Sequence, residues 1–357
     1  MNDGINFYDG SKLLSLKDIN KNDPEIYISS GTRSTGKSTF FNRFLMNKFF
    51  KYNWKFILLY RFNYELEGVE YKFFNTIKDL YFNDYNMSSK SLCKGIIREL
   101  FINEYGKNEK KDFISCGYAI SINNADQIKK YSHLLSESRH ILFDEFQSES
   151  NHYCNREIQK FMSIHMSVSR APHQPVRRVP VYMVSNYVSL LNPYYVNMGI
   201  STNLKSDTNF LRGDGFVLEQ NISPQISDLQ KKSAFNRAFS SHDYFKSATD
   251  NIYLNDNYSF IEKSPSGRYK YIFNFSYKNN TYAIKEYTES GIFYVTSKID
   301  QSRKVNIVIN LDDHNYNTVL FSRFNSLIYY LRDVFEYGNF RFNSLLSKEA
   351  TIRLLSY

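Results

Sequence analysis

A glycine-bounded loop near the N-terminus constrains the fold of this 357-residue chain more than any other feature. Residues 26–44 read IYISSGTRSTGKSTFFNRF, so strand-forming residues lead into the loop and an apolar, helix-forming run follows it. Residues 31–38 satisfy the pattern G-x-x-x-x-G-K-[S/T], in which backbone N–H groups and a helix N-terminus hold phosphates. The strand and the helix that this pattern requires are both present. The sequence therefore predicts a phosphate-binding loop, with a glycine-containing turn as the alternative.

The residue types of this loop predict separate contacts to ATP and to Mg²⁺. Lys37 would reach the β- and γ-phosphates, and the Ser38 hydroxyl would coordinate Mg²⁺. Arg33 has three open interpretations: a phosphate contact, a contact with a neighbouring subunit, or a contact with the catalytic glutamate. The predicted nucleotide-binding residues are Gly31, Thr32, Arg33, Ser34, Thr35, Gly36, Lys37, Ser38, Thr39 and Asn186.

A second motif, HILFDEF at residues 140–146, supplies the acids that nucleotide hydrolysis needs. Residues 140–143 predict a buried strand, and Asp144 at its end would hold Mg²⁺ as the Walker B acid. Glu145 would orient or deprotonate the attacking water. An acidic turn after a core strand is the alternative. Together with the loop, the motif favours a nucleotide hydrolase, because water needs a base.

Two further residues are candidates for completing the site. Asn186 ends the run VYMVSN and could present its amide to the γ-phosphate or the water, unless it only terminates a strand. Arg170 ends a predicted helix in a basic segment and could stabilise transition-state charge in a neighbouring subunit. A solvated helix face and a contact with DNA phosphates are the alternatives for Arg170.

The pattern along the chain predicts two folded domains. Short β-rich runs alternate with longer helical patterns from residue 25 to about 200, which is typical of an α/β domain with a mainly parallel sheet. Beyond residue 250, hairpin-like runs followed by helical patterns predict a separate α+β domain. The expected boundaries are 1–204 for the ATPase domain, 205–250 for a helical linker and 251–357 for the C-terminal domain. Strands are expected at 25–29, 54–60, 116–122, 140–143 and 179–185, and helices at 37–51, 155–170, 318–337 and 342–355.

The composition indicates the class of binding partner and the cellular compartment. The net charge of +9 and the pI near 9.1 suggest an acidic partner, nucleic acid before an anionic membrane surface, although a coding bias could also produce this balance. Three widely spaced cysteines and no export signal fit a reducing cytoplasm. The cysteines and histidines show no tight pairing along the sequence, so a structural zinc site is not expected. Residues 179–204 carry no charge, but prolines and asparagines interrupt them, so a buried strand and a loop are expected rather than a membrane span.

These motifs resemble the genome-packaging ATPases of phi29-like tailed bacteriophages, which are related to terminase large subunits. The resemblance runs through ISSGTRSTGKS, ILFDEF, YMVSNYVSLLNPYY and DNIYLNDNYSFIEK, and it covers nearly the whole chain. It implies a P-loop ATPase domain of the ASCE, RecA-like type, a small helical linker and a C-terminal α+β domain with an RNase H-like fold. The implied function is an ATP-driven motor that moves double-stranded DNA into a preformed procapsid in the host cytoplasm. Its implied partners are a capsid portal and further copies of the chain in a ring, with a pentamer and a packaging RNA as further expectations.

The resemblance also implies roles for individual residues. By position, Lys37 and Ser38 match the phosphate and metal residues of the family. Asp144 and Glu145 match its Walker B acid and catalytic glutamate, and Arg170 matches an arginine that acts in trans.

The resemblance leaves the roles of several basic residues open. Arg177 and Arg178 are rivals of Arg170, because the surrounding stretch differs from the family in length. Lys129 and Lys130 fall near a family lysine that acts across the subunit boundary. Arg61, after the second predicted strand, is a candidate pore residue with an ordinary surface position as the alternative.

The C-terminal domain is not expected to cut DNA. Terminases carry acids on their first nuclease strand, whereas YKYIFNFSY has Asn274 at this place and no carboxylate. Asp300, Asp312 and Asp313 lie elsewhere, and two-metal cleavage needs several converging acids. The domain is therefore predicted to bind DNA or a packaging RNA, or else to be an ordinary solvated hairpin domain. The candidate contacts are Lys263, Arg268, Lys270 and Arg341.

Two other functions remain as alternatives to the motor. A P-loop helicase or partition-type ATPase would share the loop and the acids, although no motif indicates strand separation. A non-hydrolysing scaffold that binds nucleotide and nucleic acid would keep the loop alone.

Overall fold

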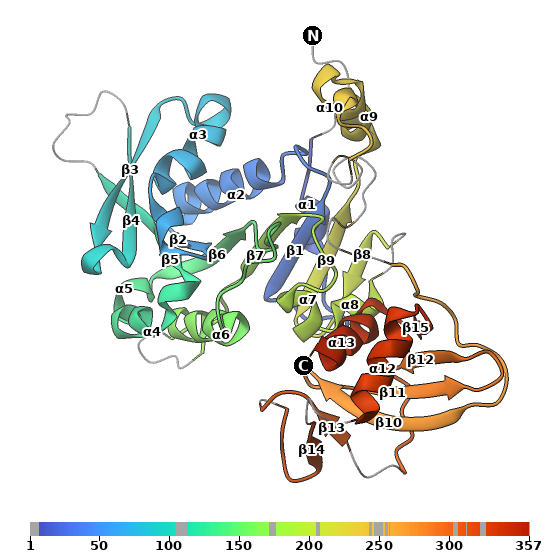
Figure 1. The fold of residues 1–357 in the computed structure, drawn as a ribbon. Coiled ribbons are helices and arrows are strands. Elements are labelled where there is room, and N and C mark those ends of the chain that lie inside the picture. Colours follow the sequence, from blue (N-terminus) through green and yellow to red (C-terminus); the bar gives the residue numbers. More distant parts are fainter. Residues whose placement is uncertain are drawn as a thin grey trace. The chain divides into compact units, whose positions relative to one another are not determined.

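The computed structural model divides the chain into two compact units. The first unit comprises Met1–Met198 and Leu204–Asn255, and the second comprises Gly199–Asn203 and Asp256–Tyr357 (Figure 1). The structure describes residues 7–104, 113–170, 176–204, 208–242, 245, 253, 256, 258–302, 306–311, 313–321 and 326–356.

The first unit is built on a nine-stranded sheet with the order β3-β4-β5-β2-β6-β7-β1-β9-β8. The six strands from β5 to β9 in this order pair in parallel, and antiparallel strands flank them on both sides. An α/β fold with a mainly parallel central sheet is therefore confirmed. The strands are β1 (Ile26–Gly31), β2 (Lys55–Tyr60), β3 (Tyr85–Leu92), β4 (Ile97–Glu104), β5 (Ile114–Ser121), β6 (Ser138–Asp144), β7 (Val181–Asn186), β8 (Phe210–Arg212) and β9 (Phe216–Asn221).

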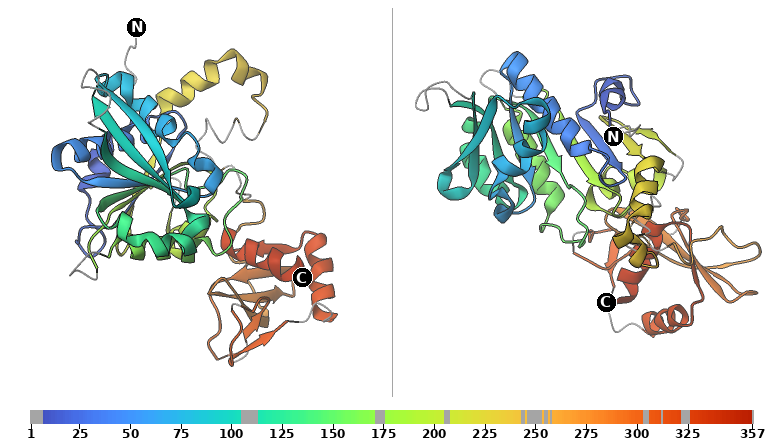
Figure 2. Two further views of the ribbon diagram at one scale, coloured as in Figure 1. Left: turned by 90° about the vertical axis from the view of Figure 1, so that its left-hand side faces the viewer. Right: turned by 90° about the horizontal axis from the view of Figure 1, so that it is seen from above.

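Helices cover both faces of this sheet. Figures 1 and 2 show α2 and α3 on one face and α4, α5 and α6 on the other. Parallel strands need such cover, because both of their faces must leave water. The helices are α1 (Ser11–Ser15), α2 (Lys37–Tyr52), α3 (Val69–Tyr81), α4 (Ala125–Ile128), α5 (Ser132–Leu135), α6 (Glu157–Val168), α7 (Pro193–Asn197), α8 (Ile200–Asn203), α9 (Pro224–Lys232) and α10 (Ala234–Ala238). Short 3-10 turns are η1 (Asn63–Leu66), η2 (Cys93–Gly95), η3 (Ile122–Asn124) and η4 (Lys129–Tyr131).

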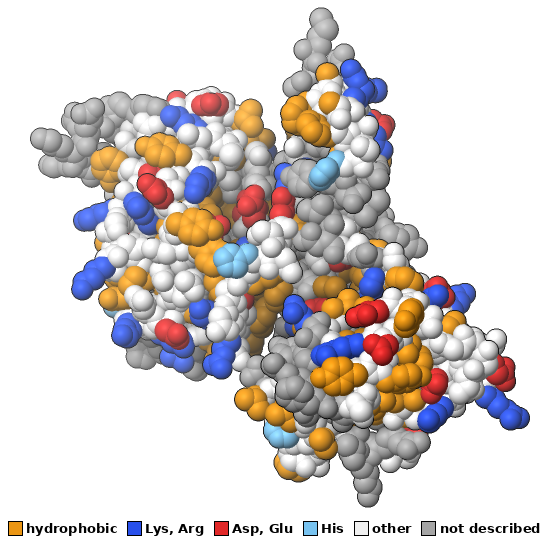
Figure 3. Space-filling model, in the orientation of Figure 1, with side chains coloured by type: hydrophobic (Ala, Val, Ile, Leu, Met, Phe, Trp, Pro, Cys, Tyr) orange, Lys and Arg blue, Asp and Glu red, His pale blue; other side chains and the backbone are white. Residues whose placement is uncertain are grey.

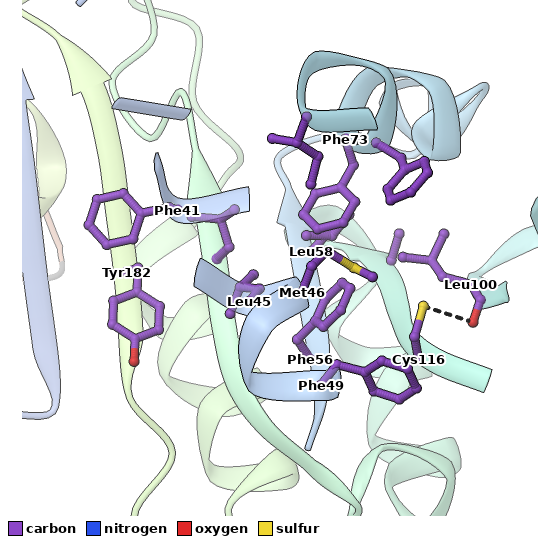
Figure 4. Close-up of a cluster of buried hydrophobic side chains, with 14 of the residues drawn as sticks. Phe41, Leu45, Met46, Phe49, Phe56, Leu58, Phe73, Leu100, Cys116 and Tyr182 are labelled. Carbon is purple, nitrogen blue, oxygen red and sulfur yellow. Dashed lines mark hydrogen bonds between the residues drawn. The ribbon is translucent and has the colours of Figure 1, made fainter. Parts of the chain in front are cut away.

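The core beneath the phosphate loop joins α2 to the main sheet and to α3. The apolar positions of α2 recur at three- and four-residue spacing and face the sheet. They pack against aromatic and aliphatic side chains of the strands, and the Cys116 thiol adds a hydrogen bond to the Leu100 carbonyl at 3.4 Å (Figure 4). This packing fixes the helix that begins at the loop. The labelled members are Phe41, Leu45, Met46, Phe49, Phe56, Leu58, Phe73, Leu100, Cys116 and Tyr182.

The structure differs from the sequence prediction after residue 204. We expected a helical linker over 205–250, but β8 and β9 form there, and β9 pairs in parallel with β1 over its full length. Residues 216–218 of β9 are buried, so this segment completes the main sheet. Helix begins only at α9, where Ser223 is the N-cap and Pro224 occupies the first turn. The antiparallel β3–β4 pair was also missed.

The second unit has a six-stranded sheet with the order β14-β13-β10-β11-β12-β15. The predicted hairpin is confirmed, since β10 and β11 pair antiparallel up to Tyr277 and Asn280 around a two-residue turn. The predicted helix over 318–337 is shorter, and a strand precedes it. The elements are β10 (Lys270–Tyr277), β11 (Asn280–Tyr287), β12 (Ile292–Thr296), β13 (Asn306–Val308), β14 (Thr318–Leu320), α12 (Ser326–Glu336), β15 (Phe340–Phe342) and α13 (Leu345–Ser356).

No helix in the described ranges combines the length and the apolar character that crossing a bilayer requires. The uncharged stretch 179–204 forms β7, a loop and two short helices instead.

One buried histidine in the sheet predicts an acid-sensitive fold. His140 on β6 bonds the Tyr182 hydroxyl at 3.1 Å, and burial lowers the pKa of this histidine to about 4. An unfolded histidine titrates near pH 6.5, so only the unfolded chain takes up this proton between about pH 6.5 and 4. We expect His140 to remove stability as the pH falls through this window, by about 1 kcal/mol per pH unit. Thermal midpoints of the wild type and of His140→Gln across this range test it, and parallel curves would contradict it.

Candidate functional site

The phosphate loop is held between β7 and β9, the two neighbours of β1. Gly31 ends β1, and a Cβ atom there would lie 2.1 Å from the Asn221 carbonyl oxygen, so only glycine allows β9 to approach this closely. The Thr32 N–H donates to that same carbonyl at 2.9 Å, and the Asn221 amide donates to the Thr35 hydroxyl at 3.3 Å. Gly36 has a φ of +91° and is the N-cap of α2. These contacts fix the loop against β9 on one side and the first turn of α2 on the other.

Lys37 lies buried within the loop. Its ammonium group donates to the carbonyls of Gly31 at 3.2 Å and Thr32 at 2.6 Å, and to the Thr35 hydroxyl at 3.4 Å. Burial lowers the pKa of Lys37 to about 8, and the charge of Asp144 opposes this shift. The ammonium group thus lies among carbonyl and hydroxyl oxygens of the loop, and a negatively charged ligand bound nearby would raise its pKa.

The two acids lie at the end of β6, one strand away from β1. Burial raises the pKa of Asp144 to about 6, while a hydrogen bond with Ser38 lowers it. Glu145 is exposed and adopts a φ of +54°, and its N–H donates to an Asp144 carboxylate oxygen at 3.0 Å. Strand β7 lies between β6 and β1, and its last residue, Asn186, is in register with Gly31. Both predicted motifs and Asn186 therefore meet at one edge of the sheet.

Two cavities flank these acids. One of about 340 Å³ is lined by Glu145 and Asn186, together with Arg33, Arg61 and Gln147. The other, of about 400 Å³, extends between α2 and α3, and Ser38, Asp144 and Glu145 all line it. Glu145 lines both cavities, so its carboxylate can reach a ligand on the Asn186 side or on the Ser38 side. Ser34 is exposed on the loop, and Thr39 is partly buried in the first turn of α2.

Arg33 forms an ion pair with Glu149, which lies four residues after Glu145. The Gln230 amide of α9 donates to the Arg33 carbonyl at 3.4 Å. This ion pair favours none of the three open interpretations of Arg33 over the others.

Gln147 is a site residue that the sequence analysis missed. Its buried amide donates to the Ser185 hydroxyl at 3.0 Å and to the Ser30 hydroxyl at 3.3 Å, and its oxygen accepts from the Ser189 N–H at 3.0 Å. The Tyr195 hydroxyl joins Ser30 at 2.6 Å. This network fixes the ends of β1 and β7 relative to the segment after Glu145. Only its place two residues after Glu145 could have indicated it.

The three candidate trans arginines have different surroundings. Arg177 is buried and donates to the carbonyls of Ser136 and Val168, both at 2.8 Å, so it caps the end of α6. Arg178 donates to the Pro24 carbonyl at 2.7 Å. Both guanidinium groups thus bind the backbone of their own subunit, whereas Arg170 is exposed two residues beyond the end of α6.

Arg61 is not a pore residue. The sequence suggested an exposed position after β2, but Arg61 is only 6% exposed. It forms an ion pair with Glu157 at 3.1 Å, in which the glutamate is also buried. A buried arginine paired within its own unit cannot line a channel, so the pore interpretation is wrong.

The remaining basic candidates are spread over the surface. Lys129 and Lys130 are exposed on η4, where Lys129 pairs with Asp126 at 3.1 Å. Figure 3 shows Lys and Arg side chains scattered over the visible face of the first unit, not gathered in one patch. In the second unit, Lys263, Arg268 and Lys270 are exposed, while Arg341 pairs with Glu262 at 3.1 Å.

The predicted lack of a nuclease centre concerns four residues of the second unit. Asn274 is buried on β10 and bonds the Tyr271 hydroxyl. Asp300 bonds Ser302, and Asp313 accepts the backbone N–H groups of the β10–β11 turn. Asp312 lies outside the described residues.

Comparison with known proteins identifies the family. The model of the podovirus DNA encapsidation protein family (Gp16) matches residues 2–356. The chain belongs to this family. It is 26% identical to the DNA packaging proteins of Bacillus phages PZA and phi29, over 98% of this chain and 96% of each relative.

Two solved structures share the fold over the whole length. A chain of the phi29 viral genome packaging motor assembly is 26% identical, with a TM-score of 0.70 over 98% of this chain and 99% of that chain. A chain of the Phi-28 gp11 DNA packaging motor is 15% identical, with a TM-score of 0.59 over 99% of each chain. This encapsidation protein is thus a DNA-packaging motor ATPase of the phi29-like type, as its motifs predicted. The helicase, partition and scaffold alternatives are not supported.

The Gln147 network predicts a loss of stability on removing the amide. Gln147→Leu would take a donor from two buried hydroxyls, which costs about 1–3 kcal/mol of unfolding free energy. Unfolding of the first unit by a chemical denaturant measures this change in free energy. Gln127→Leu, on an exposed face of α4, is the matched control and should change stability by about 0.5 kcal/mol at most. Equal effects of the two substitutions would show that the network contributes nothing.

Proposed function

We propose that this encapsidation protein couples hydrolysis of Mg²⁺–ATP to translocation of double-stranded DNA into a procapsid. The observation that carries the proposal is the meeting of Lys37, Ser38, Asp144, Glu145 and Asn186 at one edge of the sheet. In this proposal Lys37 binds the β- and γ-phosphates, and the loop N–H groups hold the rest of the phosphate chain. The strand between the two motif strands supports an ASCE-type, RecA-like domain.

The residues present fit a magnesium ion at Ser38 and Asp144. Both line one cavity, and they supply a hydroxyl and a carboxylate, the hard oxygen donors that Mg²⁺ prefers. Because burial raises the pKa of Asp144, a bound cation would stabilise its charged form. When bound, Mg²⁺ would neutralise charge on the transferred phosphate. Glu145 is exposed to the same space and is the proposed base that orients the water.

We further propose that the protein works as a homomeric ring on the capsid portal, with Arg170 acting on the site of a neighbour. The exposure of Arg170 supports this assignment over its two rivals, which bind backbone within their own subunit. Lys129 and Lys130 are proposed to act at the same boundary. The relatives belong to packaging motors, which supports DNA, portal and ring partners. A pentamer, a packaging RNA and action in the host cytoplasm are parts of the same proposal.

For the C-terminal unit we propose an RNase H-like fold without nuclease activity. The antiparallel strands β10, β11 and β12, with β13 parallel to β10, support this fold. Asn274 at the place of an expected acid, and the use of Asp313 in a turn, support the loss of cleavage. The unit would bind DNA or RNA phosphates through exposed side chains such as Lys263, Arg268 and Lys270.

Glu145→Gln tests the catalytic assignment. The variant keeps the shape of the site but loses the base, so we expect turnover to fall by about 10²- to 10⁴-fold while ATP still binds. Steady-state ATPase rates and binding of a fluorescent ATP analogue measure the two effects. Glu137→Gln, an exposed residue paired with Lys55, is the matched control and should leave both unchanged. Wild-type turnover in Glu145→Gln would refute the proposal.

Mixed rings test the trans arginine. Arg170→Ala and Lys37→Ala subunits should each be inactive alone, yet mixing them should restore part of the ATPase activity. The rescue arises because a Lys37→Ala subunit still supplies Arg170 to a neighbour with an intact loop. Arg178→Ala subunits are the control, and they should remain active without mixing. Absence of rescue would place Arg170 outside the neighbour's site.

A further inference from the structure

The backbone directly after Glu145 is held from three directions. Glu145 has a φ of +54°, in a region that residues with side chains rarely adopt unless their surroundings hold them there. The N–H of Phe146 donates to the Val184 carbonyl of β7 at 3.2 Å, and its ring is fully buried against Tyr194. Its carbonyl accepts a hydrogen bond from the Arg61 guanidinium at 2.5 Å. Of these anchors, only the last is a charged side chain.

Arg61 is itself fixed by a buried carboxylate. Its Nε atom donates to both oxygens of Glu157 at 3.1 Å. The same carboxylate accepts from the Cys154 N–H at 2.7 Å and from the Tyr194 hydroxyl at 2.8 Å. A buried ion pair stays charged when its remaining hydrogen-bonding capacity is used in this way. Glu157 lies in the first turn of α6, so the pair joins that helix to the end of β2.

The planar guanidinium makes these contacts possible at the same time. Its edge reaches Glu157 with Nε and the Phe146 carbonyl with Nη2. Its central carbon lies 4.9 Å from the ring centre of Tyr153 and 5.6 Å from that of Phe143. A lysine ammonium is a compact point charge and does not reproduce this fork.

We propose that Arg61 is a positioning residue for ATP hydrolysis. Through the Phe146 carbonyl it holds Glu145 in the left-handed conformation that directs its carboxylate into the cavity shared with Asn186. Through Glu157 it ties this conformation to α6, the helix that ends two residues before Arg170. The inference rests on the proposed catalytic role of Glu145.

Arg61→Lys is the first test. It keeps a positive charge for Glu157 and removes the fork that reaches Phe146. We expect kcat to fall by about 10- to 100-fold, because a small misplacement of a catalytic group has this cost. Affinity for a fluorescent ADP analogue should stay within about threefold, since the ammonium group of Lys37 and the guanidinium of Arg61 have different hydrogen-bond partners. Arg139→Lys, at an exposed position on β6, is the matched control and should keep wild-type kcat.

The double variant with Glu145→Gln distinguishes positioning from a general structural role. If Arg61 acts through Glu145, then Arg61→Lys should not lower the residual turnover of Glu145→Gln any further. Equal fold-losses in both backgrounds would overturn the inference. If Glu145→Gln is inactive while Arg61→Lys keeps wild-type kcat, the inference fails and the proposed function stands. If Glu145→Gln is fully active, the proposed function fails.

A second double variant separates a loss of positioning from a folding defect. Arg61→Met combined with Glu157→Gln removes both buried charges together, and the glutamine oxygen can still accept from the Cys154 N–H or the Tyr194 hydroxyl. This chain should melt near the wild-type midpoint and bind nucleotide, yet show the same loss of kcat as Arg61→Lys. A folded double variant with wild-type kcat would overturn the inference.

Discussion

The parallel pairing of β7 between β1 and β6 is the constraint on which the site depends. It places Gly31 beside Asn186 and Asp144 beside Val184, so the ends of three strands meet at one edge of the sheet. Because β1 and β6 do not touch, the phosphate loop and the acids are separated by the width of one strand. A ligand can therefore lie between them, with Asn186 beneath it.

The groups beneath this edge and those above it are held in different ways. The groups beneath it are buried polar side chains such as Gln147 and Glu157. Their hydrogen bonds connect strands with helices and loops. Such networks fix a unique arrangement, since each unmade bond in a low-dielectric interior is costly. Nearer the solvent, Glu145 is exposed and Arg33 forms an ion pair with the exposed carboxylate of Glu149. The buried network therefore supports side chains that a ligand can reach from the solvent.

Local patterns predicted the parts of the fold that depend on neighbouring residues. The strands β1 and β6 and the helix α2 follow from apolar runs and from the motif residues beside them, and all three elements are confirmed. Arg61 was misread because its partner, Glu157, lies 96 residues away, and a charged residue after a strand ordinarily faces water. Gln147 and Asn221 escaped for the same reason. Their roles arise only when β7 and β9 lie beside β1, and no local pattern specifies that pairing.

The position of β9 determines where this chain can be truncated without disturbing the phosphate loop. Asn221 supports the back of the phosphate loop, and Ser223 contacts Thr32 before it starts α9. A fragment ended at residue 204 would lose an interior strand and expose one side of β1 to solvent. Edge strands of this kind pair with other chains. The smallest unit that keeps the nucleotide loop intact therefore extends through α9, well into what the sequence presented as connecting chain.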